Sequence, residues 1–297
     1  MSRRRHLLAL ALGAVALLAG CAQPGGLQID RDTYRAKGQD SRVQFLILHY
    51  TDEDMPRSAR ILTEQAVSAH YLLSDESPPR VYQLVDESRR AWHAGASFWA
   101  GSANLNSASI GIEIVNAGEE KNADGSKRFT PYPQAQMDLM VALVRDIVTR
   151  HQIKPERVLG HSDIAPQRKI DPGPLFPWQR LGEAGLIAWP DAAKVAAVRP
   201  VFDAQLPGVA WFQEALARHG FQVDRHGQLD APTRRVIAAF QMKYRPARYD
   251  GQPDAETAAL LQALTGLAPP AVAGPVGAAA SRNGGGATSP TASPAKP

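Results

Sequence analysis

The stretch that decides the fold is residues 43–49, which read Val-Gln-Phe-Leu-Ile-Leu-His. It is an almost continuous apolar run of strand length. Strands that are buried on both faces of a parallel sheet have this composition. We therefore predict a central strand over residues 43–49, with His49 as a polar residue at its end.

Strand and helix patterns alternate on both sides of this run. Apolar residues at helical spacing predict helices over residues 58–73 and 134–150. The mixture predicts an α/β domain over residues 41–189, with a central mixed β-sheet flanked by helices. Further strands are predicted at residues 81–85, 110–115 and 157–160.

A near-repeat marks the C-terminal part of the chain. Residues 227–233 (GQLDAPT) are echoed by residues 251–257 (GQPDAET), and apolar residues follow each copy at helical spacing. Asp230 and Asp254 stand where a helix N-cap accepts backbone N–H bonds. With the amphipathic segment at 211–219, the repeat predicts a small three-helix domain over residues 208–266. A Pro-punctuated linker is predicted at residues 190–207.

Both ends of the chain have unusual compositions. Residues 1–20 combine three arginines with a short apolar run, as a secretion signal does. The signal finishes in Leu-Ala-Gly-Cys, which resembles the lipobox of bacterial lipoproteins and implies acylation of Cys21, the only cysteine. Residues 21–40 are then a tether. Residues 267–297 are nearly all small residues and proline, which predicts a disordered tail.

The expected location follows from the residue after the lipobox. Ala22 stands where Asp would favour the inner membrane in enterobacteria. We therefore expect a protein that is held by lipid at the outer membrane and faces the periplasm. We also expect it to be a monomer.

The charge balance does not favour nucleic acid as a partner. The formal net charge is +4, but loss of residues 1–20 removes three arginines and leaves 30 basic and 29 acidic residues. A protein with this balance has no net basic field to attract phosphates.

Two histidines and an aspartate are candidate metal ligands. His49 ends a buried strand, where a polar side chain needs a specific partner. His161 and Asp171 lie in a loop rich in Pro and Gly, residues 160–173. Two imidazoles and one carboxylate with a free fourth position make a catalytic zinc site. Spacing alone does not show that the three converge, and a loop histidine that bonds backbone is the alternative.

Five blocks of sequence follow one another in order: LILHYT (46–51), VSAHY (67–71), AWHAG (91–95), NSASIGIEIVN (106–116) and the loop at 161–173. Together they resemble the type 2 family of N-acetylmuramoyl-L-alanine amidases. The resemblance covers roughly residues 41–180 and is greatest to lipoprotein amidases of the bacterial outer membrane. It implies a hydrolase that uses one zinc ion per chain. Its substrate would be the amide bond between N-acetylmuramic acid and L-alanine in peptidoglycan or its turnover fragments.

Position by position, the resemblance assigns roles to five residues. The zinc ligands fall on His49, His161 and Asp171. The catalytic glutamate falls on Glu113, which would move a proton from the attacking water to the leaving amine. A lysine falls on Lys169, whose charge would stabilise the oxyanion. By residue type alone, Glu113 would be an ordinary strand-end carboxylate and Lys169 a solvated loop charge.

Other residues of these blocks are weaker candidates. We predict substrate contacts for His93, Trp92 and Tyr50, although a strand-end aromatic is more often packing. His70 is expected to make a structural hydrogen bond on a helix, as a distant alternative ligand, and Asp163 is an alternative carboxylate. The remaining histidines of the folded part are expected at the surface: His151, His219 and His226.

Residues 208–266 resemble the peptidoglycan-binding module that accompanies many wall hydrolases, on Phe240-Gln241 and the repeated turns. The implied partners are therefore peptidoglycan and muropeptides. A helical domain that only packs against the enzyme is the alternative.

Three rival functions remain open from the sequence. A non-catalytic peptidoglycan-recognition protein shares the fold but typically lacks a metal ligand. A lipid-anchored zinc peptidase would cut within the stem peptide. A glycosidase would need an acidic partner for Glu113, and none is evident.

Overall fold

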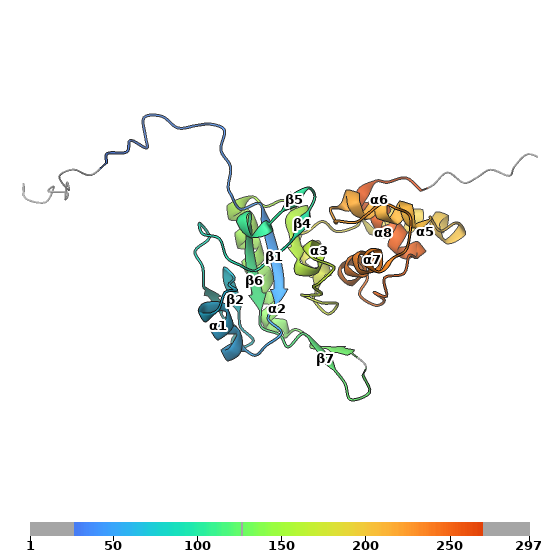
Figure 1. The fold of residues 1–297 in the computed structure, drawn as a ribbon, viewed down its shortest axis with the longest axis horizontal. Helices are drawn as coiled ribbons and strands as arrows, with labels where there is room; N and C mark the ends of the chain where they lie inside the picture. Colours follow the sequence, from blue (N-terminus) through green and yellow to red (C-terminus); the bar gives the residue numbers. More distant parts are fainter. Residues whose placement is uncertain (1–26, 126, 270–297) are drawn as a thin grey trace, which may run out of the picture. The chain divides into compact units, whose positions relative to one another are not determined.

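The computed structural model describes residues 27–125 and 127–269 (Figure 1). The predicted signal, Cys21 and residues 270–297 of the predicted tail lie outside the described residues. Residues 27–40, from the predicted tether, are exposed and form no helix or strand. Within the described ranges, no helix has the length and apolarity that a membrane crossing requires.

A five-stranded mixed sheet is the centre of the catalytic domain (Figure 1). Strand β1 pairs in parallel with β6 on one side and with β9 on the other. The pair β2–β3 is antiparallel, whereas β2 and β6 are parallel. The mixed sheet of the predicted α/β fold is thus confirmed. The strands, in spatial order, are β3 (Val81–Gln83), β2 (Tyr71–Leu73), β6 (Ser109–Ile114), β1 (Phe45–Tyr50) and β9 (Val158–Gly160).

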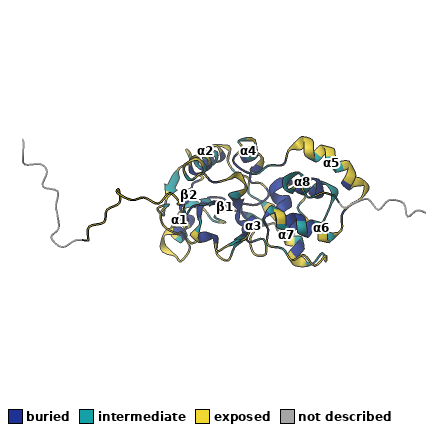
Figure 2. Cartoon of the chain, turned by 90° about the horizontal axis from the view of Figure 1, so that it is seen from above, coloured by how far each residue is buried: buried dark blue, intermediate teal, exposed yellow. Residues whose placement is uncertain are grey.

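Strand β1 is buried along most of its length (Figure 2). Its two faces pack against different parts of the chain. Leu46 and Leu48 pack in one core with residues of α2 (Gln134–His151) and α4 (Trp178–Glu183). Phe45 and Ile47 belong to a second core that also contains residues of the C-terminal helices. Successive strand residues point to opposite faces, so His49 shares the face of Phe45 and Ile47.

The helix predicted over residues 58–73 is shorter than expected. Helix α1 covers Met55–Glu64 and ends at Gln65, whose backbone is extended. Residues 71–73 are strand β2, paired on both sides and fully enclosed by the sheet. A short buried strand has no periodicity of its own, so the apolar residues of β2 fit a helical spacing equally well.

Several short elements complete the catalytic domain. Two small antiparallel pairs stand apart from the main sheet. A four-residue helix, α3 (His161–Ile164), follows β9 directly. The other elements are β4 (Phe98–Trp99), β5 (Ser102–Ala103), η1 (Leu105–Ser107), β7 (Glu119–Lys121), β8 (Lys127–Phe129) and η2 (Pro155–Arg157).

The segment predicted as a linker, residues 190–207, is largely helical. Helix α5 covers Ala192–Ala204, and the Asp191 side chain caps it by accepting from Ala193 N and Lys194 N. Pro200 lies inside this helix, where it removes one backbone donor. Phe202 and its apolar neighbours pack into the C-terminal core, which offsets that loss. The predicted three helices, α6 (Val209–His219), α7 (Ala231–Tyr244) and α8 (Ala255–Thr265), are therefore joined by a fourth.

The near-repeat has a physical basis in two buried glutamines. The Gln213 amide donates to Gln228 O and Thr233 Oγ1, and its oxygen accepts from Gly227 N. Gln241 makes the same three bonds one repeat later. Each glutamine thus fixes a turn to the start of the next helix. Asp230 and Asp254 cap α7 and α8 as predicted.

Candidate active site

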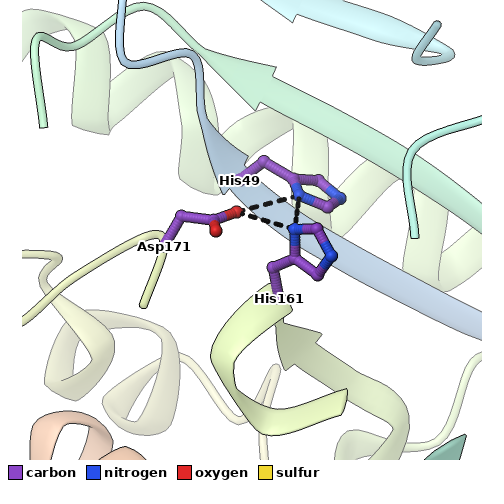
Figure 3. Close-up of side chains that lie close together, drawn as sticks. All are labelled: His49, His161 and Asp171. Carbon is purple, nitrogen blue, oxygen red and sulfur yellow. Dashed lines mark hydrogen bonds and ion pairs between the residues drawn. The ribbon is translucent and has the colours of Figure 1, made fainter. Parts of the chain in front are cut away.

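Three side chains from distant parts of the sequence point toward one another near the C-terminal end of β1 (Figure 3). His49 Nδ1 lies 3.0 Å from His161 Nδ1 and 3.0 Å from Asp171 Oδ2. His161 Nδ1 lies 3.1 Å from the same oxygen. All three residues are buried. The predicted ligand residues are therefore brought together in a group that could hold a metal ion.

The backbone explains why these residues meet. His49 is near the end of β1, and His161 opens α3 directly after the neighbouring strand β9. The carboxyl ends of parallel strands lie at one edge of the sheet, which brings the two histidines together. Ser162 N donates to Asp171 O at 2.9 Å, so the loop between His161 and Asp171 closes on itself. That closure returns Asp171 to the histidines.

Hydrogen bonds on the far side of each imidazole fix which nitrogen carries the proton. His161 Nε2 lies 3.2 Å from Ala94 O, a carbonyl that can only accept. His161 must donate there, which leaves its Nδ1 as a free lone pair.

His93 fixes the position of the proton on His49 in the same way. The Ser109 hydroxyl donates to Leu105 O, so it accepts from His93 Nε2 at 3.1 Å. His93 Nδ1 is then bare and accepts from His49 Nε2 at 3.0 Å. His49 Nδ1 is consequently a lone pair as well. Burial and the nearby His161 lower the pKa of His49 to about 4, which keeps it neutral at pH 7.

Strand β6 supplies this site with every second residue. Ser109, Gly111 and Glu113 share one face, while Ile110, Ile112 and Ile114 are buried on the other. Gly111 makes room for His93, because a Cβ at Gly111 would lie 2.5 Å from the His93 ring. Glu113 pairs in register with His49, which places the carboxylate beside the three converging atoms.

Glu113 has the environment of a proton acceptor. It lines a cavity of about 520 Å³ together with the three converging residues and Lys169. Its Oε2 atom is buried without a hydrogen-bond partner among the described residues. Burial, followed by the negative charge of Asp171, raises the pKa of Glu113 well above its usual range. Lys169 lies in the exposed part of the loop and borders the same cavity.

The predicted substrate-contact residues have different surroundings. Tyr50 and Trp92 line the cavity, and Trp92 is 48% exposed. His93 also borders it, but both its ring nitrogens are engaged by His49 and Ser109. These contacts allow His93 to orient the ring of His49, in addition to any contact with substrate.

Two alternative ligands lie outside the converging group. His70 makes structural hydrogen bonds, with Arg89 O and Gly111 N, but it precedes β2 and is not on a helix. Asp163 is buried and accepts from Gly160 N.

Two of the three histidines expected at the surface are not freely exposed. His219 packs among aromatic rings and contacts the Tyr244 hydroxyl. His151 is paired with Glu87. His226 is exposed, as predicted. A period of 3.6 residues does not reveal that the α6 terminus meets a second domain, so the contacts of His219 were missed.

Two supporting residues had no predicted role. Asn106 Oδ1 accepts from His93 N and Ala94 N, and Ser109 fixes the His93 ring. Both lie inside the block at 106–116 that carries the family resemblance. Membership of that block is the sequence feature that could have indicated their role.

Comparison with known proteins agrees with this geometry. The family model described as N-acetylmuramoyl-L-alanine amidase matches residues 39–174, and a putative peptidoglycan binding domain matches residues 205–261. The chain is 44% identical over 271 residues to the N-acetylmuramoyl-L-alanine amidase AmiD of Escherichia coli, covering 85% of this chain and 95% of AmiD. The chain belongs to the N-acetylmuramoyl-L-alanine amidase family.

Solved structures of similar proteins support the same assignment. AmpDh3 from Pseudomonas aeruginosa in complex with anhydromuramic pentapeptide has a TM-score of 0.75 at 42% identity, over 80% of this chain and 98% of that one. AmiD from E. coli, in complex with anhydro-N-acetylmuramic acid-L-Ala-D-gamma-Glu-L-Lys, has a TM-score of 0.71 at 44% identity. That match covers 78% of this amidase and 92% of AmiD.

Proposed function

We propose that this amidase hydrolyses the amide bond between N-acetylmuramic acid and L-alanine, using one zinc ion held by His49, His161 and Asp171. The observation that carries the metal is the convergence of three lone pairs within 3.0–3.1 Å of one another. Three electron-rich atoms repel each other in a buried site unless a cation lies among them. Two imidazoles and a carboxylate are the donor set of a catalytic zinc site.

The chain's own groups account for the proton transfers. Zinc, when bound, supplies Lewis acidity toward water and the amide carbonyl. Glu113 accepts the proton of the attacking water and delivers it to the leaving nitrogen of L-alanine. Its raised pKa suits both steps, since the group must take up a proton and then release it. Lys169 stabilises the negative charge that develops on the carbonyl oxygen.

The helical domain would hold the substrate beside the site. It forms part of the wall of a cavity of about 870 Å³ that shares Trp92 and Arg168 with the metal cavity. Because the two cavities share these residues, a cell-wall fragment held by the helical domain could extend to the active site. This arrangement supports peptidoglycan and muropeptides as partners. Attachment to the wall would raise the effective concentration of bonds to cut.

The anchor and location are part of the same proposal. The lipobox-like sequence before Cys21 supports acylation of that cysteine and an outer-membrane position facing the periplasm, with a monomeric enzyme. Labelled palmitate should enter the wild-type protein but not Cys21→Ser, and only the wild type should fractionate with the outer membrane. Label in Cys21→Ser would refute this anchor.

The proposed reaction is tested by digesting purified muropeptides with the enzyme and identifying the products by mass spectrometry. We expect free stem peptides that begin with L-alanine. Fragments that keep L-alanine on muramic acid would instead show a peptidase. His161→Ala should abolish the reaction, whereas His226→Ala, at an exposed histidine outside the site, should leave it unchanged.

A further inference from the structure

A buried ion pair joins the helical domain to the metal loop. Lys243, on α7, places its Nζ 2.7 Å from Oδ2 of Asp163, on α3. The two side chains are only 4% and 1% exposed. A buried carboxylate or ammonium is strongly destabilising unless it is paired with good geometry. Each of these two charges is therefore stable in its buried position only while the other is present.

Asp163 is also part of the support for a metal ligand. The oxygen that contacts Lys243 accepts from Gly160 N at 2.8 Å. Gly160 is the last residue of β9, and His161 is the first residue of α3. The Asp163 carboxylate thus fixes the turn in which the strand ends and the ligand begins.

Lys243 contacts the scaffold of this turn at two further points. Its Nζ lies 3.4 Å from Val158 O, on the same strand, and 4.4 Å from the centre of the Trp178 ring. Trp178 in turn lies 3.1 Å from the position of a Cβ at Gly160. One ammonium group from the helical domain therefore touches the strand, the helix and the ring that enclose the turn before His161.

We propose that Lys243 is a positioning residue for the metal site, so that the helical domain is part of the scaffold of that site as well as a wall-binding attachment. Loss of the ammonium leaves the Asp163 carboxylate buried and uncompensated. The carboxylate must then move or be hydrated, and Gly160 N loses its fixed acceptor. His161 Nδ1 is consequently held less firmly toward His49 and Asp171. This inference rests on the proposed metal site.

The test is the zinc affinity of Lys243→Met in the full mature chain, measured by competition with a chromophoric chelator. Partners outside the ligand shell typically change metal affinity 10–100-fold, and Lys243 acts through Asp163, so we expect about tenfold weaker binding. The visible absorption of the cobalt-substituted protein should also change, because the ligand field reports the position of His161. Lys243→Gln keeps an N–H donor and should give an intermediate zinc affinity. This second variant keeps the test decisive if Lys243→Met does not fold.

The matched control is Arg245→Met. Arg245 is a buried cation next to the end of α7, but it pairs with Asp254 inside the helical domain. Its loss should lower stability without changing zinc affinity or the cobalt spectrum. In an Asp163→Asn background, Lys243→Met should weaken zinc binding less than threefold, because the carboxylate on which it acts is gone.

The outcomes separate this inference from the function on which it rests. A Lys243→Met protein with wild-type zinc affinity and an unchanged cobalt spectrum would show that the ion pair only joins two domains. An equal loss of affinity in Arg245→Met would also overturn the inference. Failure of the wild-type protein to bind zinc would instead refute the metal site itself.

Discussion

Glu113 on β6 lies directly opposite His49 on β1 in the parallel register of the sheet. This pairing holds a carboxylate of raised pKa next to a neutral imidazole whose Nδ1 faces His161 and Asp171. The proposed acid–base group and one proposed metal ligand are thus positioned by the same pair of strands.

Glu113→Gln should retain zinc and lose turnover. The amide keeps the size of the side chain but cannot accept the proton of water, and general acid–base catalysis contributes about 100–10,000-fold. We expect kcat on an anhydromuropeptide to fall at least about 100-fold, with zinc content unchanged. Activity within tenfold of the wild type would remove Glu113 from its proposed role.

His93→Ala should weaken metal binding before it affects substrate binding. The imidazole accepts a hydrogen bond from His49 Nε2–H and so leaves His49 Nδ1 free to bind the proposed metal. We expect zinc affinity to fall about 10–100-fold, and activity to return when zinc is raised above the new dissociation constant. A variant with unchanged zinc affinity but a higher KM would assign His93 to the substrate alone.

Gly111→Ala should destabilise the protein although it adds one methyl group. The new Cβ would lie 2.5 Å from the His93 ring, and such overpacking costs about 1–3 kcal/mol. Gly208→Ala is the control, because no atom lies within 4 Å of its added Cβ. Urea unfolding of the metal-free proteins measures both, and equal stabilities would contradict the close packing of His93.

Glu87→Gln should change the acid dependence of stability. The Arg150 hydrogen bond, with help from Tyr71 and His151, lowers the pKa of Glu87 from 4.5 to about 2 against the effect of burial. A lowered folded-state pKa adds stability that is complete above the unfolded value and disappears as pH falls toward 2.

The variant should therefore melt about 2–4 °C lower at pH 7, the shift that about 1 kcal/mol produces in a domain of this size. The difference should shrink between pH 5 and pH 2 in metal-free protein. Asp146→Asn removes the more exposed partner of Arg150 and should have a smaller effect. A melting difference that stays constant over this range would contradict the pairing of Glu87.

The features that could be predicted from the sequence are those that depend on residues close together in the chain. The apolar run of β1, the amphipathic α2 and the Asp caps of α7 and α8 each depend on neighbouring residues. The convergence of His49, His161 and Asp171 could be predicted only from the family resemblance, because no periodicity relates residues so far apart. The structure supplies its physical cause, which is the shared edge of β1 and β9.

The features that could not be predicted depend on tertiary contacts. Pro200 suggested a linker, but the apolar face of α5 packs against the C-terminal core and outweighs one lost hydrogen bond. Lys243 and Asp163 are 80 residues apart, and a lysine on a helix is normally solvated. Only the fold shows that this lysine is enclosed beside the metal loop.

The most direct test of the central claim is the digestion of purified anhydromuropeptides by metal-free protein and by the same protein after one equivalent of zinc. Mass spectrometry of the products follows the appearance of free stem peptide. We predict no release without metal, full release after zinc is restored, and saturation at one zinc per chain. Release of free stem peptide at the wild-type rate by the metal-free protein would contradict the zinc mechanism.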